Sequence, residues 1–485
     1  MVKRLIPLVL MASYLSLAAT RSAEPPKPLL PVPSPPQLSW QRGELSMFLH
    51  FGVNTFTDRE WGDGKEDPKI FNPIRLEARQ WVRAAKAAGF RLVILTAKHH
   101  DGFCLWPSKY TEHSVKNSPW RGGKGDVVRE LADACREAGV KLGLYLSPWD
   151  RHEGSYGDSP RYNEYYQNQL TELLTQYGPI AEVWFDGACG EGPNGKRQEY
   201  DWKSYHMLVR RLQPAAVIFS DAGPDVRWIG NERGIAGDPC WATVDPMKVP
   251  FPGTGGADVQ VALQHGDPGG SVWRPGESDV SIRPGWFWHR KEDDRVRSVD
   301  SLVDLYFKSV GRNSLLLLNV PPNDQGLLSE VDVKRLLEFR RQLDAMLKSD
   351  LAAGKKATAS NIRGRNPAFG PGEALDGDPD TYWATDDDVT AGWIEVDLGA
   401  PVMFNIVSAQ ESIALGQRVE AHHLDYWDGN EWRTVVKCTT IGHKRLERFN
   451  AVTARRVRLV IDKSRACPTI ASFSLYCDSD SSGSK

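Results

Sequence analysis

The chain has 485 residues, too many for one ordinary hydrophobic core, so two or three domains are expected. Its 60 basic and 62 acidic residues leave a net charge of −2, and this balance gives no reason to expect nucleic acid as a partner. With 41% hydrophobic and 25% charged residues, the composition is that of a soluble globular protein. Seventeen tryptophans favour a protein that binds carbohydrate, because aromatic faces pack against the C–H faces of sugars, although large cores also use this residue.

The first residues have the layout of a secretory signal peptide. Lys3 and Arg4 precede an apolar run that ends at Ala19, and small residues lead to a cleavage site expected near Ala23. A membrane anchor is the alternative, but the run is shorter than the roughly 20 apolar residues that a span needs. We therefore predict a signal peptide at 1–23 and a secreted, extracellular mature protein that has no membrane segment.

Strand-like and helical segments alternate through the next 300 or so residues, a pattern that predicts an α/β fold, a (β/α)8 TIM-like catalytic barrel. We place this domain at 39–350, after a proline-rich extended linker at 24–38. The predicted strands are at 46–53, 91–97, 140–147, 180–185, 216–220 and 314–320. The predicted helices are at 76–88, 126–138, 162–177, 202–212, 296–310 and 330–348. The loop-rich stretch 239–284 leaves the remaining strands unplaced.

The sequence texture changes after Ala352. Residues 355–477 show short apolar–polar alternations, such as those at 392–399 and 455–460, and no helical periodicity. This pattern predicts a C-terminal β-sandwich of short strands. A polar tail at 478–485 ends the chain.

Polar and aromatic residues follow the end of one predicted strand after another, and in a barrel of parallel strands these ends build the active site. Any one of them alone would be a helix cap or a satisfied core group. Five successive strands with this feature indicate a pocket of hydrogen-bonding groups and aromatic walls, as a sugar ring requires. The residues concerned are His50, Glu60, His99, His100, Tyr145, Trp149, Trp184, Asp186 and Asp221.

Two carboxylates are needed to hydrolyse a glycoside. Asp186 directly follows the strand 180–185 and is the candidate nucleophile. Glu232, beside an aromatic strand, is the candidate acid/base, and Asp221 and Glu191 are its rivals.

A metal site has little support in the sequence. His99 and His100 are adjacent, and on a strand adjacent side chains point to opposite faces, so they do not readily bind one ion unless the strand has ended. The chain has no Cys-x-x-Cys, no Gly-x-Ser-x-Gly and no glycine-rich phosphate loop. We therefore expect catalysis without a metal or other cofactor. Seven cysteines leave at least one free thiol unless chains pair.

Four motifs, 50–52, 98–103, 182–187 and 228–232, together resemble glycoside hydrolase family 29, the retaining α-L-fucosidases, in its plant-type branch selective for α-1,3/1,4-linked fucose. The resemblance implies an exo-acting enzyme on fucosylated oligosaccharides or glycoprotein glycans, located in the apoplast if the source is a plant. It implies Asp186 as nucleophile and Glu232 as acid/base. The residues that it implies around the fucose ring are His50, Glu60, His99, His100, Tyr145, Trp149, Trp184 and Trp286.

The motifs at 374–383 and 393–399 resemble a galactose-binding-like, discoidin-type sandwich. Such modules often bind glycans, and some hold a structural calcium. The acidic loop 376–380 would supply oxygen ligands for calcium or form an ordinary turn with Asx hydrogen bonds. Support of the barrel and glycan binding both remain open for this domain. For the whole chain, the alternatives are a secreted glycan-binding protein with an inactive barrel and a transfucosidase.

Overall fold

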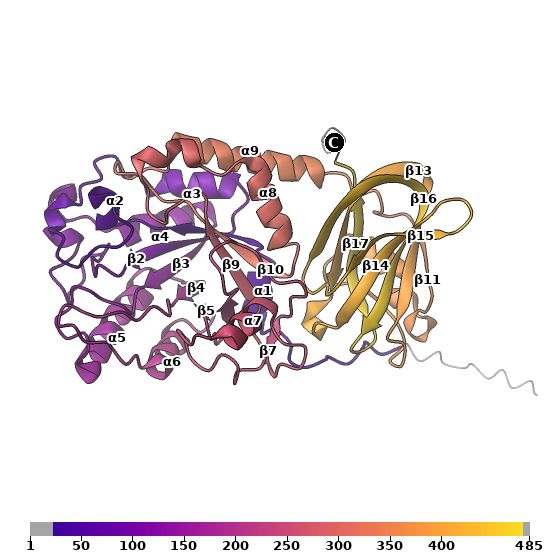
Figure 1. Cartoon of the computed structure of the whole chain (residues 1–485), viewed down its shortest axis with the longest axis horizontal. Coiled ribbons are helices and arrows are strands. Elements are labelled where there is room, and N and C mark those ends of the chain that lie inside the picture. The colour runs from indigo at the N-terminus through magenta and orange to yellow at the C-terminus, as the bar shows by residue number, and fades with distance from the viewer. Residues whose placement is uncertain (1–22, 479–485) are drawn as a thin grey trace, which may run out of the picture.

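The computed structural model describes residues 23–478, which form two domains side by side (Figure 1). The predicted signal peptide up to residue 22 and the tail from residue 479 lie outside the described residues. No helix in the described part of the chain has the length and apolar character needed to cross a membrane. All seven cysteines are described, and each is a free thiol.

The first domain is a closed barrel of eight parallel strands, and this confirms the predicted fold class. Around the barrel the order is β1-β10-β9-β6-β5-β4-β3-β2. The strands are β1 (Leu45–Leu49), β2 (Leu92–Lys98), β3 (Lys141–Leu146), β4 (Glu182–Trp184), β5 (Val217–Ser220), β6 (Val226–Trp228), β9 (Gly276–Ser281) and β10 (Ser314–Asn319). Six of them fall in the six segments predicted as strands.

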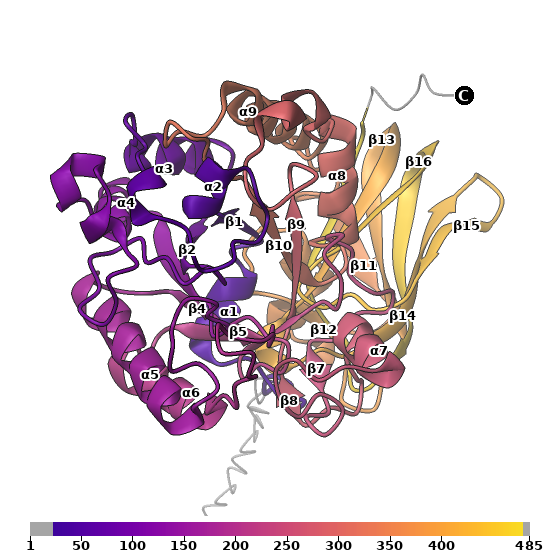
Figure 2. The same ribbon diagram turned by 60° about the vertical axis from the view of Figure 1, so that its left-hand side comes forward.

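Amphipathic helices cover the outside of the barrel (Figure 2). They are α3 (Ala78–Ala87), α4 (Val127–Ala138), α5 (Ser159–Gln176), α6 (Trp202–Leu212), α8 (Val299–Lys308) and α9 (Glu330–Met346). A short α2 (Val53–Thr57) follows β1. Helix α4 shows how the sequence sets such bounds: the Asp126 side chain accepts a hydrogen bond from the Arg129 amide, and Gly139 ends the helix with φ +67°.

One part of the barrel departs from regular strand–helix alternation. β6 follows β5 after only five residues, 221–225, so no helix separates these two parallel strands. The loop-rich stretch then contains β7 (Thr243–Val244), α7 (Ala257–His265), β8 (Val272–Trp273) and the barrel strand β9. The sequence did not place β6 and β9, because a three-residue strand and a strand carrying Glu277 and Asp279 lack a continuous apolar run.

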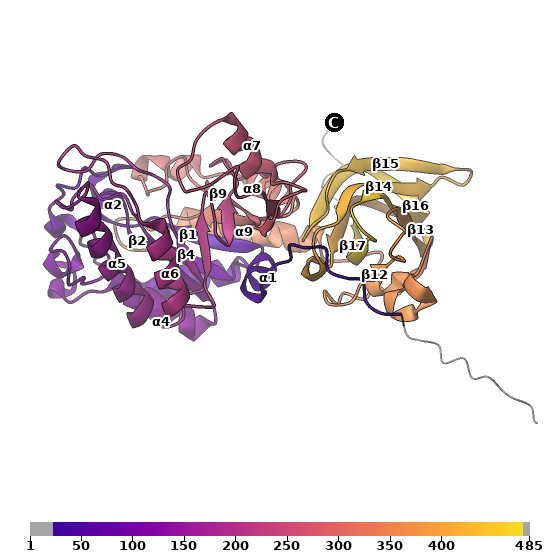
Figure 3. The same cartoon turned by 90° about the horizontal axis from the view of Figure 1, so that it is seen from below.

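The prediction of an extended linker up to residue 38 is wrong from Pro35 onward. Helix α1 (Pro35–Gln41) begins there, with prolines in its first turn, where they are tolerated. Ser34 and Gln37 form a reciprocal capping box. The preceding residues are extended and run along the sandwich, where the Leu29 amide donates to the Leu415 carbonyl (Figure 3).

The second domain is the predicted β-sandwich, with strand order β12-β17-β13-β16-β14-β15 and β11 paired to β13. Its strands are β11 (Lys356–Ala359), β12 (Trp383–Ala384), β13 (Gly392–Glu411), β14 (Val419–Trp427), β15 (Trp432–Cys438), β16 (Arg445–Ser464) and β17 (Thr469–Tyr476). The expectation of short strands throughout is wrong, because β13 and β16 have 20 residues each. Register shifts along this pair interrupt the apolar–polar alternation, which makes one long strand look like several.

Candidate active site

Asp186 lies two residues beyond the end of β4, at the carboxyl end of the barrel. The Tyr145 hydroxyl donates to Asp186 Oδ2 at 3.0 Å, and the Ala188 amide donates to Oδ1 at 2.7 Å. Burial, together with the negative charge of Asp186, holds the pKa of Tyr145 well above its usual value, so this hydroxyl keeps its proton. The side chain of Asp186 is 28% exposed. The carboxylate is therefore held in one orientation and is still open to a ligand.

His50 follows β1 and is held as a neutral imidazole. Its Nδ1 lies 2.9 Å from Asn319 Oδ1, while the Asn319 amide nitrogen donates to Ser281 Oγ and the Trp286 carbonyl. Because Asn319 Oδ1 is therefore the acceptor, His50 Nδ1 carries the hydrogen. Burial lowers the pKa of His50 to about 3. His50 Nε2 is thus an acceptor suited to a sugar hydroxyl.

His99 and His100 lie together, because the strand that precedes them has already ended. β2 ends at Lys98, so the pair sits in a turn, and the ring centroids are 4.1 Å apart. His100 Nδ1 bonds to Ser147 Oγ at 2.8 Å, and His100 Nε2 is 3.8 Å from Asp186 Oδ2. Burial lowers the pKa of both histidines. His99 Nδ1 is buried and has no hydrogen-bond partner among the described residues.

No three His, Cys, Asp or Glu residues of the described chain form a group that would hold a metal ion. In the acidic loop of the sandwich, Asp376 and Asp378 accept hydrogen bonds from the amides of Asp378 and Asp380. Thr381 Oγ1 also donates to Asp376 at 2.8 Å. These are the Asx bonds of an ordinary turn.

Glu60 anchors an aromatic loop beside the site. Its carboxylate accepts hydrogen bonds from the amides of Trp286, at 2.7 Å, and Phe287, at 3.2 Å. His289 Nε2 lies 2.7 Å from Glu60 Oε1, and His289 Nδ1 lies 2.5 Å from Asp58 Oδ1. Although burial acts to lower the pKa of His289, its bonds to the two carboxylates raise it overall. The sequence singled out Glu60 and Trp286, but not Asp58, whose contact with His289 completes the anchor.

Glu232 is brought to the site by the loop after β6. Trp286 Nε1 donates to Glu232 Oε2 at 3.3 Å. Burial raises the pKa of Glu232, and the negative charges of Asp186 and Glu60 raise it further against the bond from Trp286. A carboxyl group with a raised pKa is suited to donate a proton.

The two rivals of Glu232 have different settings. Asp221 Oδ2 accepts a hydrogen bond from the Gly253 amide at 2.9 Å, and burial, helped by the charge of Asp186, raises the Asp221 pKa to about 6. Glu191 is exposed, and its backbone carbonyl accepts a bond from Trp149 Nε1. Asp221 therefore remains an electrostatic neighbour of Asp186, while Glu191 contributes a backbone contact.

The tryptophans near the site fall into two groups, one buried in the barrel core and one that forms an aromatic wall beside the site. Trp184 is only 7% exposed, stacks on Phe219 at 4.1 Å and donates to Glu277 Oε1 inside the barrel. Trp149 packs against His100 at 4.8 Å, and Trp61, 59% exposed, lies 5.7 Å from Trp149. The exposed aromatic wall therefore includes Trp61, whereas Trp184 belongs mainly to the core beneath the site.

Sequence reasoning also missed the carboxyl group of Asp279 on β9. Trp228 Nε1 donates to Asp279 Oδ1 at 2.8 Å. Burial, together with the charges of Glu232 and Asp186, raises the pKa of Asp279 well above its usual value. A buried carboxyl group with a raised pKa is thus an electrostatic neighbour of the two candidate catalytic residues. No signal pointed to it, because β9 itself was not placed.

The sequence profile of the alpha-L-fucosidase family matches residues 39–345. This range contains all of the candidate catalytic and sugar-binding side chains. The chain belongs to the alpha-L-fucosidase family. This confirms the resemblance to glycoside hydrolase family 29 and makes the chain a glycoside hydrolase. The F5/8 type C domain profile matches residues 356–473, in agreement with the discoidin-type sandwich.

Relatives of this fucosidase family are similar along nearly the whole chain. Alpha-L-fucosidase 1 of Arabidopsis thaliana is 50% identical over 482 residues, which cover 98% of this chain and 94% of that protein. The structure of a Ruminococcus gnavus GH29 fucosidase in complex with fucose superposes with a TM-score of 0.88 at 36% identity, covering 96% of this chain and 98% of that one. A structure from Bacteroides thetaiotaomicron gives a TM-score of 0.88 at 43% identity over 94% and 99% of the two chains.

Proposed function

We propose that this fucosidase-family chain is a retaining exo-α-L-fucosidase that works through a covalent fucosyl-enzyme. Asp186 attacks the anomeric carbon while Glu232 donates its proton to the leaving oxygen, so the glycosidic bond breaks as the ester bond forms. Glu232 then takes a proton from water, which displaces Asp186 and releases fucose with its configuration retained. The observation that carries this proposal is the pairing of an oriented Asp186 carboxylate with a Glu232 carboxyl of raised pKa.

The neutral histidines suit the ring of the sugar. His50, His99 and His100 are buried, their pKa values are lowered by burial, and each has a ring nitrogen with the capacity to meet a hydroxyl. Trp149 and Trp286 supply apolar surface for the C–H face and the methyl group of fucose. Glu60 contributes by holding the loop that carries Trp286.

The proposed substrates are terminal α-1,3/1,4-linked fucosides of oligosaccharides or glycoprotein glycans. This linkage preference rests on the four motifs that resemble the plant-type branch of the family. The exposed aromatic wall of Trp61 and Trp149 supports it, because it offers surface to a branched sugar outside the fucose pocket.

The test is incubation of the mature protein with a Lewis-type trisaccharide and with an α-1,2-fucosylated glycan, followed by proton NMR. We expect fucose from the Lewis glycan alone, appearing first as the α-anomer. Initial β-fucose would overturn the retaining mechanism. Equal release from both glycans would overturn the linkage proposal, and release from neither would favour a glycan-binding protein.

We also propose secretion, on the basis of the basic and apolar residues at 1–23. Expression of the full chain in a secreting host, with N-terminal sequencing of the protein in the medium, tests this. A mature N-terminus near Glu24 is expected, and retention of the protein in the cells would contradict it.

A further inference from the structure

A second concave site lies outside the barrel, where the missing helix between β5 and β6 leaves the outer layer open. This groove encloses about 1050 Å³. One side is α6, and the other side consists of Ala222, Pro224 and the loop 250–252. Figure 2 shows α6 on one side of this region and the loops around β7, β8 and α7 on the other. None of Asp186, Glu232 and the three histidines of the proposed fucose pocket lines this groove.

Buried polar atoms without partners gather in this groove. Arg274 Nε and Nη1 and His206 Nε2 are buried, and none has a hydrogen-bond partner among the described residues. Burial lowers the pKa of Arg274, helped by the nearby charge of Arg227 and opposed by Asp225. A buried guanidinium with unsatisfied donors is costly for a protein, and a bound anion would satisfy it.

The charged side chains that line the groove are all cationic. Its lining includes four cationic side chains and no carboxylate; the cations are Lys203, Arg210, Arg211 and Arg274. Asp225 lies nearby, but its Oδ2 is already engaged by Arg210 and by the Ile218 amide. Arg210 is therefore neutralised by Asp225, whereas Lys203, Arg211 and Arg274 form no ion pair with a described residue and would attract an anion.

The walls of the groove are apolar and aromatic. Trp202 lies at one side, and Phe251 and Met207 are 55% and 59% exposed. Exposed aromatic faces pack well against the C–H faces of sugar rings. The combination of such walls with the guanidinium of Arg274 fits a sugar ring that carries a carboxylate.

We propose that this groove is a binding site for uronic acid residues of an acidic polysaccharide, distinct from the fucose pocket. The carboxylate would accept hydrogen bonds from Arg274, and the pyranose ring would pack on Phe251. Bound in this way, an acidic polysaccharide would hold the enzyme near its substrate without occupying the catalytic site.

The experiment uses calorimetry on the mature protein with a trimer of α-1,4-linked galacturonic acid. Maltotriose is the neutral trimer with the same linkage, and inorganic sulfate supplies an oxyanion without a sugar. The variants are Arg274→Gln, Phe251→Ala and, as a matched loss of charge on α9 away from the groove, Arg341→Gln. Thermal melting and fucoside turnover are measured for each.

We expect the acidic trimer to bind at least tenfold more tightly than maltotriose, with an affinity that falls as salt rises. Arg274→Gln should weaken binding at least tenfold, Phe251→Ala several-fold and Arg341→Gln not at all. Turnover should be unchanged in all three, and Arg274→Gln should not lower the melting temperature. These results are independent of whether the fucosidase proposal holds.

Four outcomes would overturn the proposal. Equal binding of maltotriose would remove the role of the carboxylate, and sulfate binding as tight as that of the trimer would remove the role of the sugar. Unchanged affinity of Arg274→Gln for the trimer would show that Arg274 does not bind it. If the wild type binds no trimer and Arg274→Gln melts several degrees lower than the wild type, Arg274 is a structural residue.

Discussion

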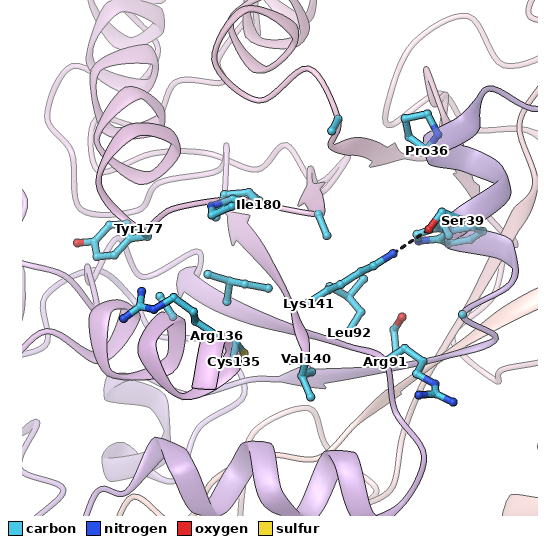
Figure 4. Close-up of a pocket in the computed structure, with 18 of the residues that line it drawn as sticks. Pro36, Ser39, Arg91, Leu92, Cys135, Arg136, Val140, Lys141, Tyr177 and Ile180 are labelled. Carbon is cyan, nitrogen blue, oxygen red and sulfur yellow. Dashed lines mark hydrogen bonds between the residues drawn. The ribbon is translucent and has the colours of Figure 1, made fainter. Parts of the chain in front are cut away.

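The two ends of the barrel differ sharply in chemistry. The carboxyl end gathers Asp186, Glu232 and three neutral histidines. The opposite end holds a pocket of about 530 Å³ between α1, α4 and the starts of β2 and β3, and its lining is mostly apolar (Figure 4). The only hydrogen bond drawn there joins Lys141 Nζ to Ser39 Oγ at 2.9 Å. This pocket is thus at the opposite end of the barrel from the proposed chemistry.

The physical reason lies in how parallel strands end. Loops that follow the strands are free to carry polar side chains toward a common centre, whereas at the other end Trp40 of α1 packs into the apolar interior of the barrel. A cavity therefore becomes a catalytic site through the titratable groups that converge on it and not through its size. Variants at both ends of the barrel test this contrast.

The largest effect is expected for Asp186→Ala. Loss of the nucleophile should lower kcat/KM for an aryl fucoside by at least about 1000-fold, with a melting temperature within about 2 °C of the wild type because the side chain is partly exposed. Asp294→Ala, which removes an exposed carboxylate elsewhere, is the control. Turnover near the wild-type level in Asp186→Ala would contradict the assignment.

Glu232→Ala should lower kcat by about 100- to 10,000-fold for a substrate with a poor leaving group, because general acid catalysis is lost. With an activated aryl fucoside, whose leaving group needs no protonation, azide should restore the rate and yield a fucosyl azide, since azide needs no general base in the second step. Asp221→Asn is the matched comparison. Rescue of the Asp221 variant in place of the Glu232 variant would move the acid/base role to Asp221.

The pH profile offers a finer test. Glu232 must be protonated for the first step, so activity falls as the pH rises through its pKa, which is raised above the ordinary value by burial. The bond from Trp286 opposes this rise, so Trp286→Phe should shift the alkaline limb of kcat/KM to higher pH. An unchanged or lower alkaline limb in this variant would separate Glu232 from that limb.

Filling the opposite pocket should have little effect on activity. Ala132→Leu places added methyl groups in the apolar pocket, and we expect kcat/KM within about twofold of the wild type and a free energy of unfolding changed by about 1 kcal/mol or less. His50→Phe likewise introduces an apolar side chain, but at the catalytic end, and it should lower kcat/KM by about 100-fold. Comparable losses from the two variants would contradict the division between the two ends.

The smallest effect is expected from a chelator. Asp376 and Asp378 are already engaged by the amides of their own loop, so EDTA should change neither the melting temperature nor turnover. A melting temperature that falls with EDTA and recovers with calcium would show that the sandwich holds the structural ion. Magnesium added in place of calcium is the control.

Much of this architecture was present in local sequence patterns. Continuous apolar runs predicted six barrel strands, and helical periodicity predicted the helices around them, because both depend on residues close together in the chain. Asp186 was found for the same reason, since it directly follows a strand. The sequence also predicted the change to a sandwich after Ala352.

The features that the sequence did not predict depend on the tertiary structure. It placed β6 and β9, and with β9 the buried Asp279 beside Glu232. It joined Glu60 to a loop more than 220 residues away, and it removed Trp184 from the exposed wall. These features depend on burial and on contacts between distant segments, which change the pKa and exposure of a side chain without leaving a pattern in its neighbouring residues.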